Sequence, residues 1–207
     1  MREESVSRPA SVKALRERLA WDPTLGHISD GPRRYLLMRP DVLMGAAVAM
    51  APVHRSSFLS SLESSTCEHG SDSLRAYAQM VQGDRLALMQ STVSAAADLG
   101  WGRWSITQGA DTLHLEVLDS PFASGWRAAS LGRTTEEPVC APIRGMLQAL
   151  AEVVLQGPVT VQEDDCAAVQ AQDSCPLEVP VTSGDDGGHV RGAPCTCRFT
   201  AMLRSAP

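Results

Sequence analysis

Hydrophobic and polar positions follow two different periods along this chain, and the change between them falls near Gly100. From 41 to 99 the sequence is rich in Ala, Leu, Met and Ser and poor in β-branched residues, a composition that favours helices. Apolar residues recur three and four positions apart, as they do on the buried face of a helix. We therefore predict several helices in this stretch, with breaks at Pro52, Gly70 and Gly83.

After Gly100 the apolar positions alternate with polar ones. The two alternating runs, 103–107 and 113–117, flank a turn at 109–111. This pattern predicts a β-hairpin with one buried face.

Two more helices follow the hairpin. Ser120 and Pro121 suit the cap and the first position of a short helix. The stretch 142–155 carries a continuous apolar stripe and is the clearest amphipathic helix in the chain.

Shorter apolar runs predict the remaining elements. They indicate a helix at 12–19, an early strand at 34–38, and later strands at 159–162, 176–182 and 198–203. The predicted class is α/β (α+β), with an antiparallel sheet of about five strands packed against a helical layer.

Composition then narrows the class of protein. A chain of 207 residues is long enough for one sizeable domain, and its net charge of −6 argues against a large nucleic-acid surface. The longest apolar run, 42–53, is too short to span a bilayer, and the charged N-terminus lacks the apolar stretch of a signal peptide. We expect a cytoplasmic protein whose six cysteines serve as thiols or metal ligands.

Four residues have the chemistry of a metal site. Glu163, Cys166 and Cys175 fall within thirteen residues, and Cys140 precedes them by 23 positions. Thiolates with one carboxylate satisfy a tetrahedral zinc ion, and four protein ligands make such a site structural. Scattered structural thiols are the alternative interpretation.

Other residues compete for a place in this site. Asp164 or Asp165 could substitute for Glu163. The pair Cys195 and Cys197 would lie on one face of a strand, and Cys195 is the main rival for a ligand position.

The sequence contains no motif typical of an enzyme. Gly-x-Ser-x-Gly, Gly-x-Gly-x-x-Gly and P-loop motifs are absent, and the five histidines show no paired spacing. A pocket for a small hydrophobic ligand is predicted between the sheet and the helices. Its candidate lining residues, which could equally fill an ordinary core, are Trp104, Phe122, Trp126, Met89 and Met146.

These motifs together resemble the 4-vinyl reductase (4VR) domain family. The resemblance rests on Glu137-Pro138-Val139-Cys140 with Gly145, on Glu163-x-x-Cys166 and Cys175, and on the stretches 34–38, 41–45, 100–102 and 120–122. It covers about residues 25–203, so we expect a helical extension at 1–24 and a ligand-binding domain at 25–207. The chain departs from the family pattern at Gln170, where glycine is common, and in the eight residues that separate Cys166 from Cys175.

The resemblance implies a fold and a function. The family is similar in fold to NO-sensing and Golgi-transport ligand-binding units, and it includes sensor domains of σ54-dependent activators that respond to aromatic hydrocarbons. It implies that Cys140, Glu163, Cys166 and Cys175 hold structural zinc, that the chain forms a homodimer, and that it signals to a protein partner. Two alternatives are a role in tetrapyrrole (bacteriochlorophyll) 4-vinyl reduction and a scaffold of the transport-particle type.

Overall fold

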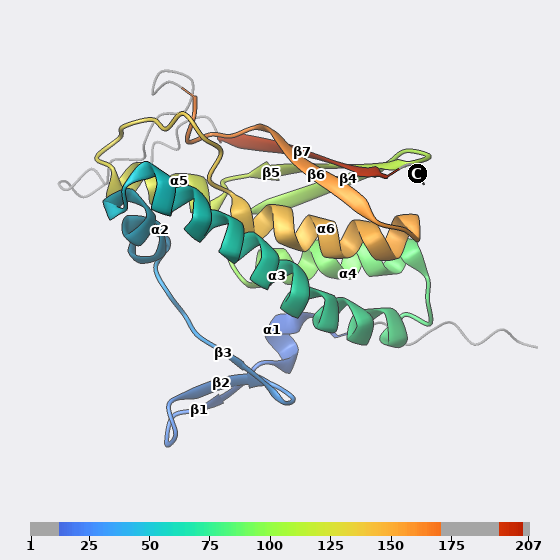
Figure 1. Ribbon diagram of the computed structural model, residues 1–207. Coiled ribbons are helices and arrows are strands. Elements are labelled where there is room, and N and C mark those ends of the chain that lie inside the picture. The colour runs from blue at the N-terminus through green and yellow to red at the C-terminus, as the bar shows by residue number, and fades with distance from the viewer. Residues whose placement is uncertain (1–12, 171–194, 205–207) are drawn as a thin grey trace, which may run out of the picture.

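The N-terminal part of the chain forms a small unit beside the main body (Figure 1). The computed structural model describes residues 13–170 and 195–204. The unit contains α1 (Leu15–Arg18) and an antiparallel sheet of β1 (Ala20–Asp22), β2 (His27–Asp30) and β3 (Arg33–Tyr35), in the order β1-β2-β3. Arg18 ties it to the body, because its Nη2 donates to Tyr77 Oη at 2.9 Å. Within the unit, the same nitrogen contacts Asp30 Oδ2 at 3.0 Å.

Three helices make up the predicted helical half of the chain. They are α2 (Pro40–Ala49), α3 (Pro52–Met80) and α4 (Arg85–Asp98). The breaks predicted at Pro52 and Gly83 are confirmed, but the break predicted at Gly70 is wrong, since α3 runs straight through it. Gly70 serves close packing there, because a Cβ at this position would lie 2.8 Å from the Met146 sulfur.

The main sheet has four antiparallel strands in the described residues. They are β4 (Arg103–Gln108), β5 (Thr112–Leu118), β6 (Val159–Asp165) and β7 (Thr196–Leu203), in the order β4-β5-β7-β6. Every second residue of β5 is fully buried, which confirms the predicted hairpin with one buried face. The strand predicted at 176–182 lies outside the described residues.

The two predicted helices after the hairpin are also present. Ser120 caps α5 (Pro121–Ala129), where its Oγ accepts a hydrogen bond from the Ala123 N–H. The longer helix, α6 (Ala141–Leu155), lies between the sheet and α3 and contacts both (Figure 1). Nine of its residues are buried, so α6 forms the centre of the hydrophobic core.

The architecture agrees with the predicted class, an antiparallel sheet packed against helices. The small sheet crosses the predicted domain boundary at residue 24, since β1 lies before it and β2 after it. The division into an extension and a domain stays a prediction. In the described part of the chain, no helix is long and apolar enough to cross a membrane.

Candidate metal centre

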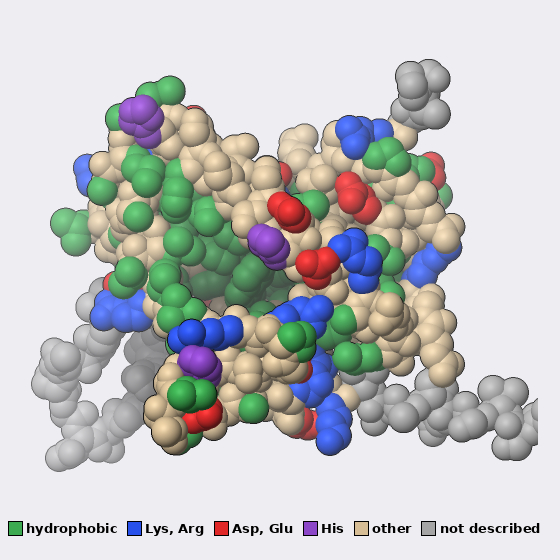
Figure 2. Space-filling model, turned by 60° about the horizontal axis from the view of Figure 1, so that its bottom comes forward, with side chains coloured by type: hydrophobic (Ala, Val, Ile, Leu, Met, Phe, Trp, Pro, Cys, Tyr) green, Lys and Arg blue, Asp and Glu red, His purple; other side chains and the backbone are tan. Residues whose placement is uncertain are grey.

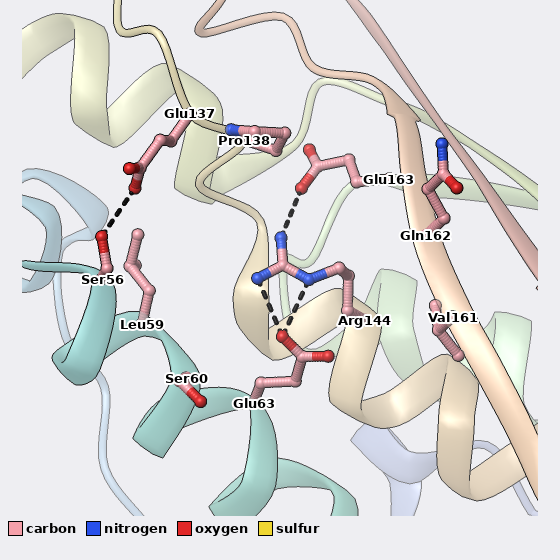
Figure 3. Close-up of a pocket in the computed structure, with 10 residues that line it drawn as sticks. All are labelled: Ser56, Leu59, Ser60, Glu63, Glu137, Pro138, Arg144, Val161, Gln162 and Glu163. Carbon is pink, nitrogen blue, oxygen red and sulfur yellow. Dashed lines mark hydrogen bonds and ion pairs between the residues drawn. The ribbon is translucent and has the colours of Figure 1, made fainter.

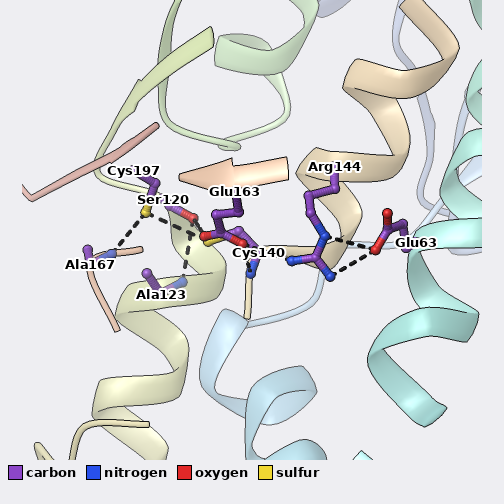
Figure 4. Close-up of polar contacts among 8 residues, drawn as sticks. All are labelled: Glu63, Ser120, Ala123, Cys140, Arg144, Glu163, Ala167 and Cys197. Atoms are coloured by element: carbon purple, nitrogen blue, oxygen red, sulfur yellow. Dashed lines mark hydrogen bonds and ion pairs between the residues drawn. The ribbon is translucent and has the colours of Figure 1, made fainter. Parts of the chain in front are cut away.

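Four side chains that could hold a metal ion meet where the sheet joins α6, and all but Cys166 are drawn in Figure 4. They are Cys140, Glu163, Cys166 and Cys197, and one ligand atom from each lies within 4.8 Å of all the others. Cys140 precedes the first residue of α6 and Glu163 lies near the end of β6. The site therefore joins the start of the central helix to the last two strands.

Strand register brings Cys197 into this group. β6 and β7 are antiparallel, with Glu163 opposite Phe199 and Asp165 opposite Arg198. The register shifts between Glu163 and Asp165, so the end of β6 is irregular. Cys197 lies one residue before Arg198, and this places its side chain beside the residues that follow β6.

The four side chains fit a zinc ion in size and in chemistry. Tetrahedral zinc with Zn–S bonds of about 2.3 Å places its sulfurs about 3.8 Å apart. The Sγ atoms of Cys140 and Cys197 lie 3.8 Å apart. All four residues are buried, and Glu163 Oε1 has no hydrogen-bond partner in the described part of the chain. Since a buried carboxylate oxygen rarely stays unpaired, this atom is the natural fourth ligand.

Hydrogen bonds from the surrounding chain hold the ligands in place (Figure 4). Ser120 Oγ lies 3.1 Å from Cys140 Sγ, and the Ala167 N–H donates to Cys197 Sγ at 3.3 Å. The Cys140 N–H donates to Glu163 Oε2 at 3.2 Å. Such outer contacts orient metal ligands and tune their affinity.

Burial opposes negative charge in most of the cluster. It raises the pKa of Cys140 well above its ordinary value. Burial and the neighbouring Cys166 sulfur raise the pKa of Glu163 to about 9, although Arg144 acts in the opposite direction. Hydrogen bonds to Cys140 and Cys166 lower the pKa of Cys197 to about 5. A divalent cation would favour the ionised form of all four ligands.

Arg144 links the cluster to α3 (Figure 3). Its Nη1 donates to Glu163 Oε2 at 2.9 Å, while Nε and Nη2 both lie 2.8 Å from Glu63 Oε2. Burial acts against its charge, but the two carboxylates outweigh burial and raise the pKa of Arg144. All three residues line a cavity of about 400 Å³ between α3, α6 and β6, together with Glu137, which bonds to Ser56 Oγ at 2.9 Å.

Three of the four predicted metal ligands, Cys140, Glu163 and Cys166, come together in the structure. The fourth, Cys175, lies outside the described residues. Among the described residues Cys197 completes the cluster. Cys195, the predicted rival, lies outside this group and is disulfide-bonded, which corrects the expectation that all six cysteines are thiols or metal ligands. The missed signal was the position of Cys197 at the start of the last alternating run, opposite the strand that carries Glu163.

The carboxylates considered as substitutes for Glu163 have other partners. Asp164 accepts a hydrogen bond from Thr200 Oγ1 at 2.7 Å. Asp165 pairs with Arg198 at 3.0 Å and is exposed to solvent on the sheet. Glu163 is the carboxylate that faces the cysteines.

The four residues predicted to bind a ligand are buried or half-buried. Trp104 and Phe122 both contact Trp101, with ring centroids 6.4 and 5.4 Å apart. The Arg55 guanidinium lies 4.9 Å above the Trp126 ring, whose buried Nε1 has no hydrogen-bond partner within residues 13–170 and 195–204. Met146 packs against Gly70 of α3. None of the four lines the cavity beside Arg144, and their role in ligand binding stays a prediction.

Comparison with known proteins shows the fold. No protein-family model matches the chain. A sequence comparison with curated proteins finds no match. Among solved structures, the chain is similar to the phenol-responsive sensory domain of the transcription activator PoxR in complex with phenol. The TM-score is 0.66 at 16% identity, over 91% of this chain and 86% of that one.

The chain has the fold of that sensory domain. A weaker likeness, with a TM-score of 0.42 and 10% identity, relates it to trafficking protein particle complex subunit 3 from Naegleria fowleri, covalently bound to palmitic acid. This second match covers 80% of this chain and 95% of that one.

Proposed function

We propose that this protein is a zinc-stabilised, small-molecule-binding sensor domain of the 4-vinyl reductase type. It binds a small hydrophobic or aromatic molecule and passes the signal to a protein partner. The buried cluster of Cys140, Glu163, Cys166 and Cys197 is the observation that carries the proposal.

The ion is proposed to be zinc in a structural role. Thiolates favour soft or borderline metals, and zinc accepts cysteine sulfurs together with an Asp or Glu oxygen in a tetrahedral site. Four protein ligands leave no open position for water or substrate. When bound, zinc would supply a cross-link between α6, β6 and β7, and the chemistry of sensing belongs to a separate pocket.

The ligand-binding half of the proposal rests on two observations. The fold is similar to that of a phenol-responsive sensory domain. In addition, Trp126 has a buried indole N–H, at the junction of α5 and the start of α3, that finds no hydrogen-bond partner among the described residues. A hydroxyl group on an aromatic ligand could accept this hydrogen bond, while Trp104, Phe122 and Met146 supply apolar walls.

Thermal melting with a panel of small aromatics tests this half. A ligand at one hundred times its Kd stabilises the folded state by about 2.7 kcal/mol. For a chain of this size that is a rise in Tm on the order of 5–10 °C. We expect phenol or a substituted phenol to raise the Tm, and toluene to raise it less because it cannot accept the Trp126 hydrogen bond.

Two matched variants locate the site. Trp126→Phe should reduce the shift by phenols and leave the shift by toluene unchanged. Trp104→Phe is the control, since the Trp104 N–H already donates to the Trp101 carbonyl at 3.0 Å. If no aromatic compound raises the Tm of the zinc-loaded protein, the sensor proposal fails and a scaffold role gains support.

The exposed apolar segment after β3 supports the proposed homodimer. Leu36, Leu37 and Met38 are consecutive, and 77%, 72% and 52% of their surfaces are exposed. They continue β3, which is an edge strand of the small sheet. Figure 2 shows hydrophobic side chains gathered around a hollow on the face that carries this unit. Contiguous exposed apolar surface of this kind marks an interaction site, and we propose a second copy of the chain as its occupant.

A further inference from the structure

The two oxygens of Glu163 have different surroundings. Oε2 accepts hydrogen bonds from Arg144 Nη1 at 2.9 Å and from the Cys140 N–H at 3.2 Å. Oε1 is buried and has no hydrogen-bond partner among the residues that the structure describes. Only 1% of the Glu163 side chain is exposed, so water does not compensate for this difference. Hydrogen-bond donors of the protein therefore occupy Oε2, whereas Oε1 is left for a metal ion.

The charge of a filled site calls for a nearby cation. Three thiolates and one carboxylate around a divalent ion leave a formal charge of −2 in a buried place. Burying uncompensated charge is costly, and a hydrogen-bonded cation reduces the cost. The Arg144 guanidinium contacts Glu163 directly, and its side chain is only 15% exposed. It is therefore placed to lower the charge of the filled centre.

A second carboxylate holds Arg144 in this position (Figure 3). Glu63 of α3 receives both Nε and Nη2 through its Oε2 at 2.8 Å. Three nitrogens of the guanidinium are thus divided between two carboxylates on opposite sides. A lysine ammonium could contact one of these carboxylates, but it lacks the planar set of N–H groups with which arginine binds both.

The helices are close enough for this bridge because Gly145 lies at their crossing. A side chain at Gly145 would collide with the Glu63 backbone. Arg144 also lies four residues after Cys140, on the same side of α6, so that ligand and cation come from one helical turn.

We infer that Arg144 is the positioning residue of the metal centre, and that Glu63 of α3 holds Arg144 in place. This inference rests on the proposed function, because it requires that the cluster binds a metal ion. Arg144 fixes the carboxylate of Glu163 so that Oε1 meets the ion, and the chain Glu163–Arg144–Glu63 couples metal loading to the packing of α3 on α6.

Metal affinity and spectroscopy test this inference in the full chain. Zn²⁺ affinity is measured by competition with a chelator, and the ligand field by visible absorption of the Co²⁺-loaded protein. Loss of an outer contact to a metal ligand typically weakens binding about 10- to 100-fold. We expect that range for Arg144→Met, a smaller loss in the same direction for Glu63→Gln, and partial recovery with Arg144→Lys.

Glu137→Gln is the matched control. Glu137 lines the same cavity, but its partner is Ser56, so its Zn²⁺ affinity and Co²⁺ spectrum should equal those of the wild type. If Arg144→Met does not fold, Arg144→Lys and Glu63→Gln decide the question.

The outcomes separate the two claims. A wild type that binds neither Zn²⁺ nor Co²⁺ overturns the proposed metal centre, and this inference with it. A wild type that binds both, with Arg144 and Glu63 variants of equal affinity and spectrum, overturns only the inference. Variants that melt lower but keep wild-type affinity would show a merely structural ion pair and also overturn it.

Discussion

Cys197 joins the metal cluster through the pairing of two strands that are far apart in the sequence. It follows Cys166 by 31 positions, and its sulfur still lies 3.8 Å from that of Cys140. Hydrogen bonds to Cys140 and Cys166, together with the Ala167 N–H at 3.3 Å, lower the pKa of Cys197 and favour its thiolate form. The thiolate is the form of cysteine that binds a metal ion.

Cysteine variants distinguish the structural cluster from the set that the sequence suggested. We expect Cys197→Ser to lose most of the bound zinc, because three ligands remain in a buried site. Cys175→Ser should keep about one ion per chain, since the other four ligands are complete without it. The zinc content of each variant, determined after gel filtration, tests both expectations. Cys67→Ser, a half-buried thiol of α3, is the control. Zinc lost from the Cys175 variant but kept by the Cys197 variant would contradict this assignment.

The sequence allowed three of the four cluster residues to be predicted, for a physical reason. Glu163 and Cys166 are close in the chain, and Cys140 begins a helix whose pattern is clear. The position of Cys197 depends on the register of β6 against β7, across a long intervening segment. A short turn fixes the register of two strands, but 30 residues separate β6 from β7, so no turn in the sequence shows which of their residues face one another.

At the scale of elements, periodicity predicted where most helices and strands lie. It located α6 and the hairpin of β4 and β5, since both have one buried face of regular period. It failed at Gly70, where glycine usually suggests a break. There the absent side chain makes room for Met146 across the α3–α6 crossing. Such close packing between helices cannot be read from either helix alone.

The extended segment after β3 makes a prediction of its own. If Leu36 and Leu37 pack against a second copy of the chain, the double variant Leu36→Ser/Leu37→Ser should be a monomer. Light scattering after gel filtration should give the wild type twice the chain mass of 22.1 kDa. Leu131→Ser is the control, because Leu131 is 91% exposed in the turn after α5. A monomeric wild type would refute the dimer.

At the scale of the whole molecule, the metal centre connects parts that the chain order separates. A bound ion would fasten the start of α6 to the ends of β6 and β7, while Arg144 extends the connection to α3. The sheet, the central helix and the outer helix would then be held at one point. Because the unfolded chain lacks this preformed site, metal binding adds directly to folding stability.

Zinc content with a paired melting curve tests the metal centre most directly. The wild-type protein, purified without chelators, should contain about one zinc ion per chain. Removal of the ion should lower the Tm by at least about 10 °C, given the usual strength of structural zinc sites. Added Zn²⁺ should restore it. Protein that contains no zinc and melts at the same temperature with or without added Zn²⁺ would contradict the account.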